Sequence, residues 1–181
     1  MSNLTYIKYN ILRLLAKLAS DRQLNVTPFL FPEASPLVRW QTEFINSNLP
    51  LLDIDNKFNS DCIVSKGSLP GSLDVEDFIW SEEYEQLTVT FSATLTGKAL
   101  DTDSVIITLV KRDCTAIYSR IDEDNTRVSG QSLFNPLVHL GVTIENFVPS
   151  EWIAFVTFHR FADPEGVISL CSNSQGGDIL T

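Results

Sequence analysis

One thiol and two imidazoles of this sequence are candidates for nucleophilic chemistry. Cys114, His139 and His159 all fall in segments with a strand-like pattern, and a histidine beside a cysteine on a neighbouring strand can activate the thiol as a nucleophile. Their spacing gives no sign that they meet. The sequence also has no Gly-x-Ser-x-Gly turn and no glycine-rich phosphate loop. We therefore do not expect an enzyme and predict no catalytic residue and no cofactor, although an unusually reactive Cys114 or His139 would indicate a hydrolase.

The three cysteines are the residues to consider for a metal site or a redox pair. Cys62, Cys114 and Cys171 lie far apart in the sequence, so they form neither a zinc motif nor a redox pair. An odd number of widely spaced cysteines is typical of buried thiols in a reducing compartment. We predict no metal site and expect a cytoplasmic location.

Charge is divided unevenly along the chain. The net charge is −10, yet residues 1–20 contain Lys8, Arg13 and Lys17 and no acidic residue. The rest of the chain has the other 10 basic residues and all 23 acidic ones, a net charge of −13. Such a body repels phosphate backbones and anionic lipids. Nucleic acid is therefore not an expected partner, and membrane contact is expected only through residues 3–20.

Residues 3–20 have the pattern of an amphipathic helix. Leu12 and Leu15 widen an apolar face on which five residues follow one another at alternating spacings of three and four, the spacing of a heptad seam. These five are Leu4, Ile7, Ile11, Leu14 and Leu18. The helix could dock on its own domain, pair with a helix of another chain, or lie on a membrane surface or serve as a mitochondrial presequence. We predict the five seam residues as an interaction site.

The next segment contains prolines at every fourth position. Pro28, Pro32 and Pro36 keep residues 23–35 extended, since proline fixes φ and keeps its predecessor out of the helical region. Ser35 then caps a helix with Pro36 in its first turn. The elements expected after this stiff connector are the helix Pro36–Asn48, a short strand Cys62–Lys66 and a short acidic helix Leu73–Tyr84.

The second half of the chain has a β pattern. Apolar and hydroxyl side chains alternate through Gln86–Thr96, which specifies a strand with one apolar face. Ser104–Lys111 is apolar on both faces, so we expect both of its faces to be covered. The other expected strands are Cys114–Ile121, Arg127–Phe134, Leu137–Glu145, Trp152–Phe161 and Val167–Cys171, with turns at Asp122–Asn125 and Asp163–Gly166.

These patterns predict an α+β protein. N-terminal helices precede a mainly antiparallel β-sheet of five to seven strands, which either stays open or curls into a sandwich or open barrel. The predicted organisation is an amphipathic helix at 1–22, a connector at 23–35, a single α+β domain at 36–172 and a flexible tail at 173–181.

The terminal heptad seam and the lack of a catalytic constellation together suggest a function. We expect a non-enzymatic, intracellular structural or interaction protein that self-associates as a homo-oligomer, or binds another protein, in part through its N-terminal helix. The alternative is a β-barrel or sandwich that binds a small hydrophobic ligand. Its apolar pocket would be lined by Phe91, Trp152, Phe155 and Phe158.

Overall fold

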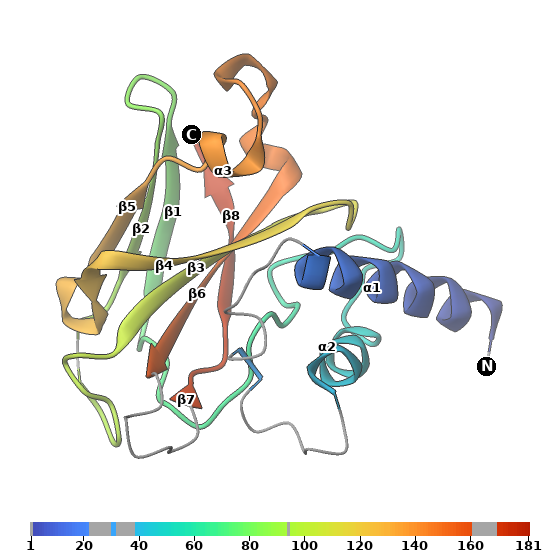
Figure 1. Ribbon diagram of the computed structural model, residues 1–181, viewed down its shortest axis with the longest axis horizontal. Helices are drawn as coiled ribbons and strands as arrows, with labels where there is room; N and C mark the ends of the chain where they lie inside the picture. The colour runs from blue at the N-terminus through green and yellow to red at the C-terminus, as the bar shows by residue number, and fades with distance from the viewer. Residues whose placement is uncertain (1, 22–29, 32–38, 94, 161–169) are drawn as a thin grey trace.

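The computed structural model describes residues 2–21, 30–31, 39–93, 95–160 and 170–181 (Figure 1). The expected turn Asp163–Gly166 lies outside the described residues, as does the expected connector apart from Leu30 and Phe31. The helices are α1 (Asn3–Asp21), α2 (Trp40–Asn48) and the short α3 (Leu137–Leu140). The strands are β1 (Val75–Ser81), β2 (Gln86–Phe91), β3 (Ser104–Lys111), β4 (Ile117–Thr126), β5 (Gln131–Phe134), β6 (Trp152–Arg160), β7 (Leu170–Cys171) and β8 (Gln175–Leu180).

All eight strands belong to one sheet, with the order β4-β3-β6-β8-β1-β2-β5 and with β7 added beside β6. Every pairing is antiparallel except that of β1 with β8. Helices at the N-terminus followed by a mostly antiparallel sheet confirm the predicted α+β class.

The sheet curls until its two edge strands, β4 and β5, approach each other in an almost closed barrel (Figure 1). Side chains join these edges. Ser132 Oγ of β5 donates to Asp122 Oδ2 of β4 at 2.6 Å. The guanidinium of Arg120 lies 5.6 Å from the centre of the Phe134 ring. The open barrel is thus the form of the sheet that the structure adopts.

Two hydrophobic cores lie on opposite faces of β3 and β6. Inside the barrel, Val105, Ile107 and Leu109 pack against Phe78, Leu87, Val89 and Phe158. We call this cluster the barrel core. Outside the barrel, Ile106 and Val110 pack with Phe155 under residues of α1 and α2, including Leu12, Leu15 and Phe44, and we call this second cluster the outer core. The expectation that β3 is covered on both faces is confirmed, because the barrel fills one side and the helices cover the other.

The predicted flexible tail at 173–181 is wrong, because Gln175–Leu180 form β8, which joins β6 to β1. Its glycines are needed for close packing. A Cβ at Gly176 would lie 2.6 Å from the Phe155 ring, and one at Gly177 would lie 2.7 Å from the Phe78 ring. Small residues, which suggested a tail in the sequence, let a central strand pass between aromatic rings on both faces.

The predicted helix Leu73–Tyr84 is wrong, because Val75–Ser81 form β1. Apolar residues in this short segment fit a helical period as well as alternation. Hydrogen bonding to β2 and β8 decides for the strand, and Phe78 and Trp80 then point into the barrel core.

Three further local predictions also fail. Residues 62–66 are irregular, because their amides bond to side chains: Ile63 N to Asn48 Oδ1, and Val64 N and Ser65 N to Ser174 Oγ. The predicted strand Leu137–Glu145 contains α3 and a turn of 3₁₀ helix at Ile144–Asn146. The predicted turn Asp122–Asn125 lies within β4, where Asp122 pairs with Val105 of β3 and residues 123–125 form a bulge before Thr126 pairs with Ser104.

Candidate functional site

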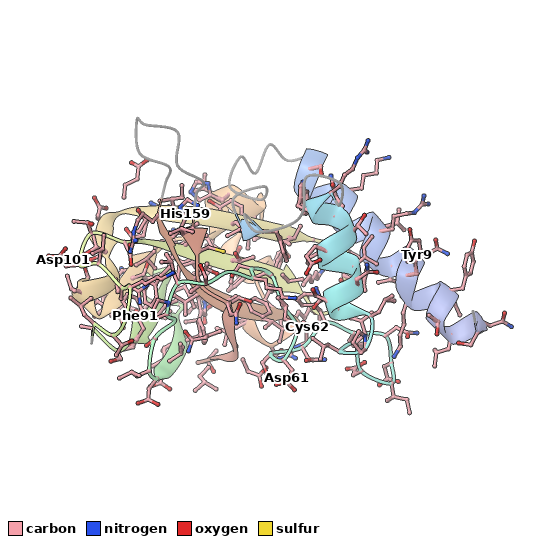
Figure 2. The ribbon with its side chains drawn as sticks, turned by 90° about the horizontal axis from the view of Figure 1, so that it is seen from below. Tyr9, Asp61, Cys62, Phe91, Asp101 and His159 are labelled. Carbon is pink, nitrogen blue, oxygen red and sulfur yellow. The ribbon has the colours of Figure 1, made fainter. Side chains whose placement is uncertain are left out.

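Helix α1 docks on its own domain through one of its two apolar stripes. Leu12, Leu15, Ala16 and Ala19 are buried in the outer core, and α1 contacts α2 and β4. Figure 2 shows α1 and α2 side by side at one end of the molecule. Of the placements compatible with the sequence, docking on its own domain is therefore the one observed.

The predicted interaction residues form a second stripe. Leu4, Ile7 and Leu14 keep 51%, 47% and 56% of their surface exposed. Ile11 and Leu18 are partly buried and pack against the outer core, so they lie where the two stripes meet. A helix turns by about 100° per residue, which places the centres of the two stripes roughly a third of a turn apart. We call Leu4, Ile7 and Leu14 the open stripe.

Exposed cations lie on the solvent side of α1, and Lys17, three residues after Leu14, borders the open stripe. Arg13 and Lys17 are exposed, whereas Lys8 is half-buried and its Nζ donates to Leu52 O at 3.3 Å. Because α1 contains no acidic side chain before its last residue, this surface is apolar at its centre and positive along one edge. Such a surface suits an apolar partner with acidic surroundings.

The structure places Cys114 and His139, the thiol and imidazole considered above, in different surroundings. His139 is an exposed residue of α3 whose ring stacks on Tyr118, with ring centres 5.1 Å apart. Cys114 is buried in the turn after β3. Burial raises the pKa of Cys114 to about 11 and that of Cys62 to about 12. Both thiols therefore stay protonated at neutral pH and are poor nucleophiles.

A different pair meets in the structure. His159 of β6 stands opposite Cys171 of β7 in the strand register, and both side chains are fully buried. Cys171 Sγ donates to Leu30 O at 3.3 Å. Burial lowers the pKa of His159 to about 4, partly offset by the carboxylate of Asp103, so the imidazole is neutral at pH 7. A turn over the expected residues 163–166 would instead pair residue 159 with residue 170, so the sequence carried no signal for this pairing.

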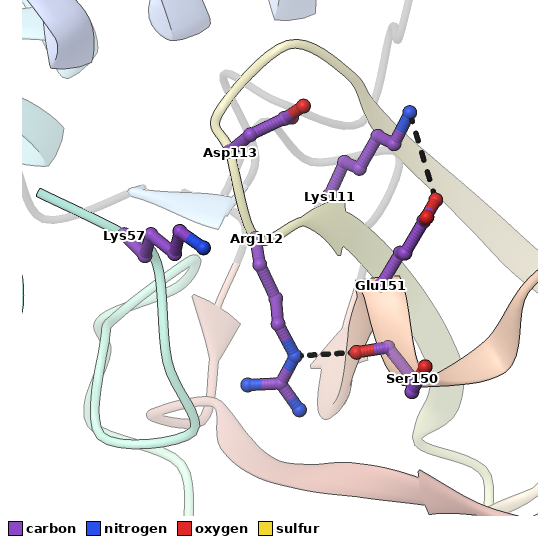
Figure 3. Close-up of a pocket in the computed structure, with 6 residues that line it drawn as sticks. All are labelled: Lys57, Lys111, Arg112, Asp113, Ser150 and Glu151. Atoms are coloured by element: carbon purple, nitrogen blue, oxygen red, sulfur yellow. Dashed lines mark hydrogen bonds and ion pairs between the residues drawn. The ribbon is translucent and has the colours of Figure 1, made fainter. Parts of the chain in front are cut away.

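A pocket of about 310 Å³ opens between the ends of β3 and β6 and the loop that contains Lys57 (Figure 3). Arg112 Nη2 pairs with Asp178 at 2.7 Å, and its Nε donates to Ser150 O at 2.7 Å. Lys111 Nζ lies 3.9 Å from Glu151. A small anion here would have to compete with these carboxylates for the cations, so the pocket is a weak basis for a function.

The four residues of the expected ligand pocket do not line one cavity. Phe91, Trp152 and Phe158 belong to the barrel core, where the rings of Phe91 and Phe158 lie 5.3 Å apart. Phe155 points to the other face of β6 and packs against Phe58 in the outer core. Alternation along β6 separates the side chains of residues 155 and 158. These four residues therefore do not form the expected pocket. Ligand binding by the barrel stays a prediction.

Comparison with family models, with curated protein sequences and with solved structures finds no match for this chain. None of the helices in the described part of the chain combines the length and apolar character needed to span a bilayer. Over the same residues, no three histidine, cysteine or acidic side chains are grouped as metal ligands. The open stripe is therefore the feature from which we argue a function.

Proposed function

We propose that this chain is a non-enzymatic, intracellular structural or interaction protein that self-associates, with α1 as one contact. The observation that carries the proposal is the open stripe on a helix that already buries another apolar stripe. Docking on the domain needs only one apolar stripe. A second, solvent-exposed one is typical of an element that has a further partner.

The strength of the contact follows from its size. Each residue of the open stripe is about half exposed, so covering it contributes about 1 kcal/mol, or half of the ~1.5–3 kcal/mol for full burial. Three such residues, with a similar gain from the partner's surface, reach about 6 kcal/mol. Association itself costs roughly 4–15 kcal/mol. Self-association through α1 is therefore weak unless other contacts add to it, and its extent should depend strongly on protein concentration.

The cysteines support the intracellular part of the proposal. Cys62, Cys114 and Cys171 are all buried and none forms a disulfide. Proteins that mature in oxidising compartments commonly use their cysteines as cross-links. Buried reduced thiols fit a reducing compartment.

The test measures the solution mass of the full chain by sedimentation over a range of concentrations. A helix variant, Leu4→Gln/Ile7→Gln/Leu14→Gln, should shift the protein to monomer without a large change in thermal stability, because the altered side chains lie outside the core. Leu100→Gln is the matched control and should leave association unchanged, because Leu100 is 47% exposed and lies beside Asp101, at the end of the molecule opposite α1 (Figure 2).

Two results would reject the proposal: a wild-type chain that is monomeric at every concentration, or a helix variant that associates as the wild type does. Deletion of α1 is an unsuitable substitute for the point changes. It would also remove Leu12 and Leu15 and expose the outer core.

A further inference from the structure

The wall of the barrel farthest from α1 and α2 exposes a row of apolar side chains. Leu180 of β8 pairs with Ile79 of β1, Ile79 pairs with Thr88 of β2, and Thr88 pairs with Leu133 of β5. Leu180, Ile79 and Leu133 are 52%, 41% and 39% exposed. We call these three residues with Thr88 the sheet row. Their neighbours along the strands, such as Phe78, Leu87 and Phe134, point into the barrel core.

The sheet row and the open stripe match in length. Strands lie about 4.8 Å apart, so a row across four strands is roughly 14 Å long. A helix rises about 1.5 Å per residue, so the open stripe from Leu4 to Leu14 spans roughly 15 Å. A helix lying across the strands could therefore cover the row with all three of its exposed apolar residues.

Their charges are also complementary. Asp77, two positions before Ile79, projects from the same face of β1, and Glu82, Glu83 and Glu85 are exposed in the turn between β1 and β2. Asp178, two positions before Leu180, is held by Arg112. Against this acidic border, α1 presents two exposed cations, Lys17 beside the open stripe and Arg13 one turn before Lys17. Opposite charges at the rim favour this pairing and its orientation.

A single molecule cannot make this contact with itself. Helix α1 covers the outer face of the wall that contains β3 and β4, whereas β1, β2 and β5 form the opposite wall (Figure 1). The occupant must come from a second copy. Because the two surfaces differ, the contact is head-to-tail, and it either closes into a ring or continues as a linear chain.

We propose that the open stripe of α1 in one copy docks across the sheet row of the next copy. This inference rests on the proposed self-association and names the surface that receives the helix. The sheet row also adds contacts that the estimate for the open stripe alone requires, because it is itself apolar and its border carries the opposite charge.

The test combines the helix variant with a sheet variant, Ile79→Thr/Leu133→Thr/Leu180→Thr, which keeps residues suited to strands. Each variant alone should be monomeric, with at least a tenfold loss of affinity. An equimolar mixture should form a 1:1 heterodimer, because the helix variant retains an intact sheet row and the sheet variant retains an intact open stripe. Val138→Thr, at an exposed residue of α3, is the control and should associate as the wild type does.

The other outcomes separate the two proposals. If the helix variant is monomeric but the sheet variant associates normally, or if the mixture forms no heterodimer, α1 meets another surface, such as a second α1. The sheet row is then rejected while self-association stands. If neither variant alters the mass, or the wild type is a monomer, both proposals fail.

A charge exchange provides a second test that leaves the apolar packing intact. Asp77→Lys/Glu83→Lys should weaken association about tenfold, as should Arg13→Glu/Lys17→Glu. Mixing the two variants should restore part of the affinity, because both kinds of contact between unlike variants then join opposite charges. Lack of any recovery, with both variants folded, would contradict the proposed pairing of these surfaces.

Discussion

At the scale of single residues, the buried charges around Asp103 stand out, because a charged group inside the core must be compensated by an opposite charge. Arg127 is fully buried, its Nε donates to Asp103 Oδ2 at 3.0 Å, and its guanidinium lies 4.2 Å from the centre of the Phe158 ring. Arg160 Nε donates to the other oxygen of Asp103 at 2.8 Å. One carboxylate thus compensates two guanidinium groups.

Asp103→Asn should destabilise the protein by about 3–5 kcal/mol, because it leaves a buried arginine without its counter-charge. Urea unfolding measures the loss. Glu43→Gln is the control, since the Lys66–Glu43 pair is at the surface and solvent-screened, and its removal should cost about 1 kcal/mol or less. Similar losses for the two variants would show that Asp103 does not have this role.

His159 predicts a dependence of stability on pH. Its pKa is lowered to about 4 by burial, whereas an unfolded histidine titrates near 6.5. Between these two pKa values the unfolded chain binds more protons than the native one. The contribution of neutral His159 to the free energy of unfolding is therefore fully present above about pH 6.5, and about 3 kcal/mol of it is lost as the pH falls towards 4.

Replacement of His159 by leucine should remove this part of the pH dependence in urea unfolding followed from pH 7 to pH 4. The exposed His139→Gln is the matched control and should keep the wild-type slope between these pH values. An unchanged slope in His159→Leu would show that other groups, such as carboxylates, cause the acid sensitivity.

At the scale of secondary-structure elements, β8 decides whether the sheet is continuous. It pairs with β6 on one side and with β1 on the other, and so connects the strands under the helices to the opposite wall. Gly176 and Gly177 allow it to pass close to Phe155 and Phe78. A segment of polar and small residues is thus essential to the architecture through its backbone.

Deletion of residues 173–181 should abolish cooperative unfolding, because it removes the strand between β6 and β1 and leaves both with unpaired edges. Near-ultraviolet circular dichroism and a thermal melt would detect the loss. Removal of Thr181 alone, which lies beyond β8, should have little effect. A shortened chain with the melting temperature of the wild type would mean that β8 is dispensable.

At the scale of the whole molecule, the barrel is closed by side chains between β4 and β5. Asp122 accepts hydrogen bonds from Ser132 Oγ at 2.6 Å and from Asn125 Nδ2 at 2.8 Å. Burial alone would raise the pKa of Asp122, but these hydrogen bonds and that from the Asp124 amide outweigh it and lower the pKa. The ionised carboxylate is therefore the form that closes the barrel.

Asp122→Ala should loosen this junction and cost about 1–3 kcal/mol, because Ser132 stays buried without its acceptor. Hydrogen exchange should become faster in β5 and remain slow in β3, which is paired on both sides. The exposed neighbour Glu123→Ala should leave exchange in β5 unchanged. Equal acceleration in both strands would indicate global destabilisation instead of local opening.

Features that depend on local periodicity were accessible from the sequence alone. Alternation specified the strand from Gln86, and apolar residues on both faces of Ser104–Lys111 predicted a strand covered on both sides, as the two cores confirm. The spacing of the N-terminal apolar residues specified α1. In each case the period of the side chains is a property of the chain itself, whatever packs against it.

Only the tertiary structure decided which partners these elements meet. Pairing with β2 and β8 made a strand of the expected helix Leu73–Tyr84, and pairing with β6 and β1 made a strand of the expected tail. The register of β6 with β7 brought His159 to Cys171. Packing against α2 and β4 chose which stripe of α1 is buried, and left Leu4, Ile7 and Leu14 exposed. These outcomes depend on contacts between residues far apart in the chain, for which local side-chain spacing carries no information.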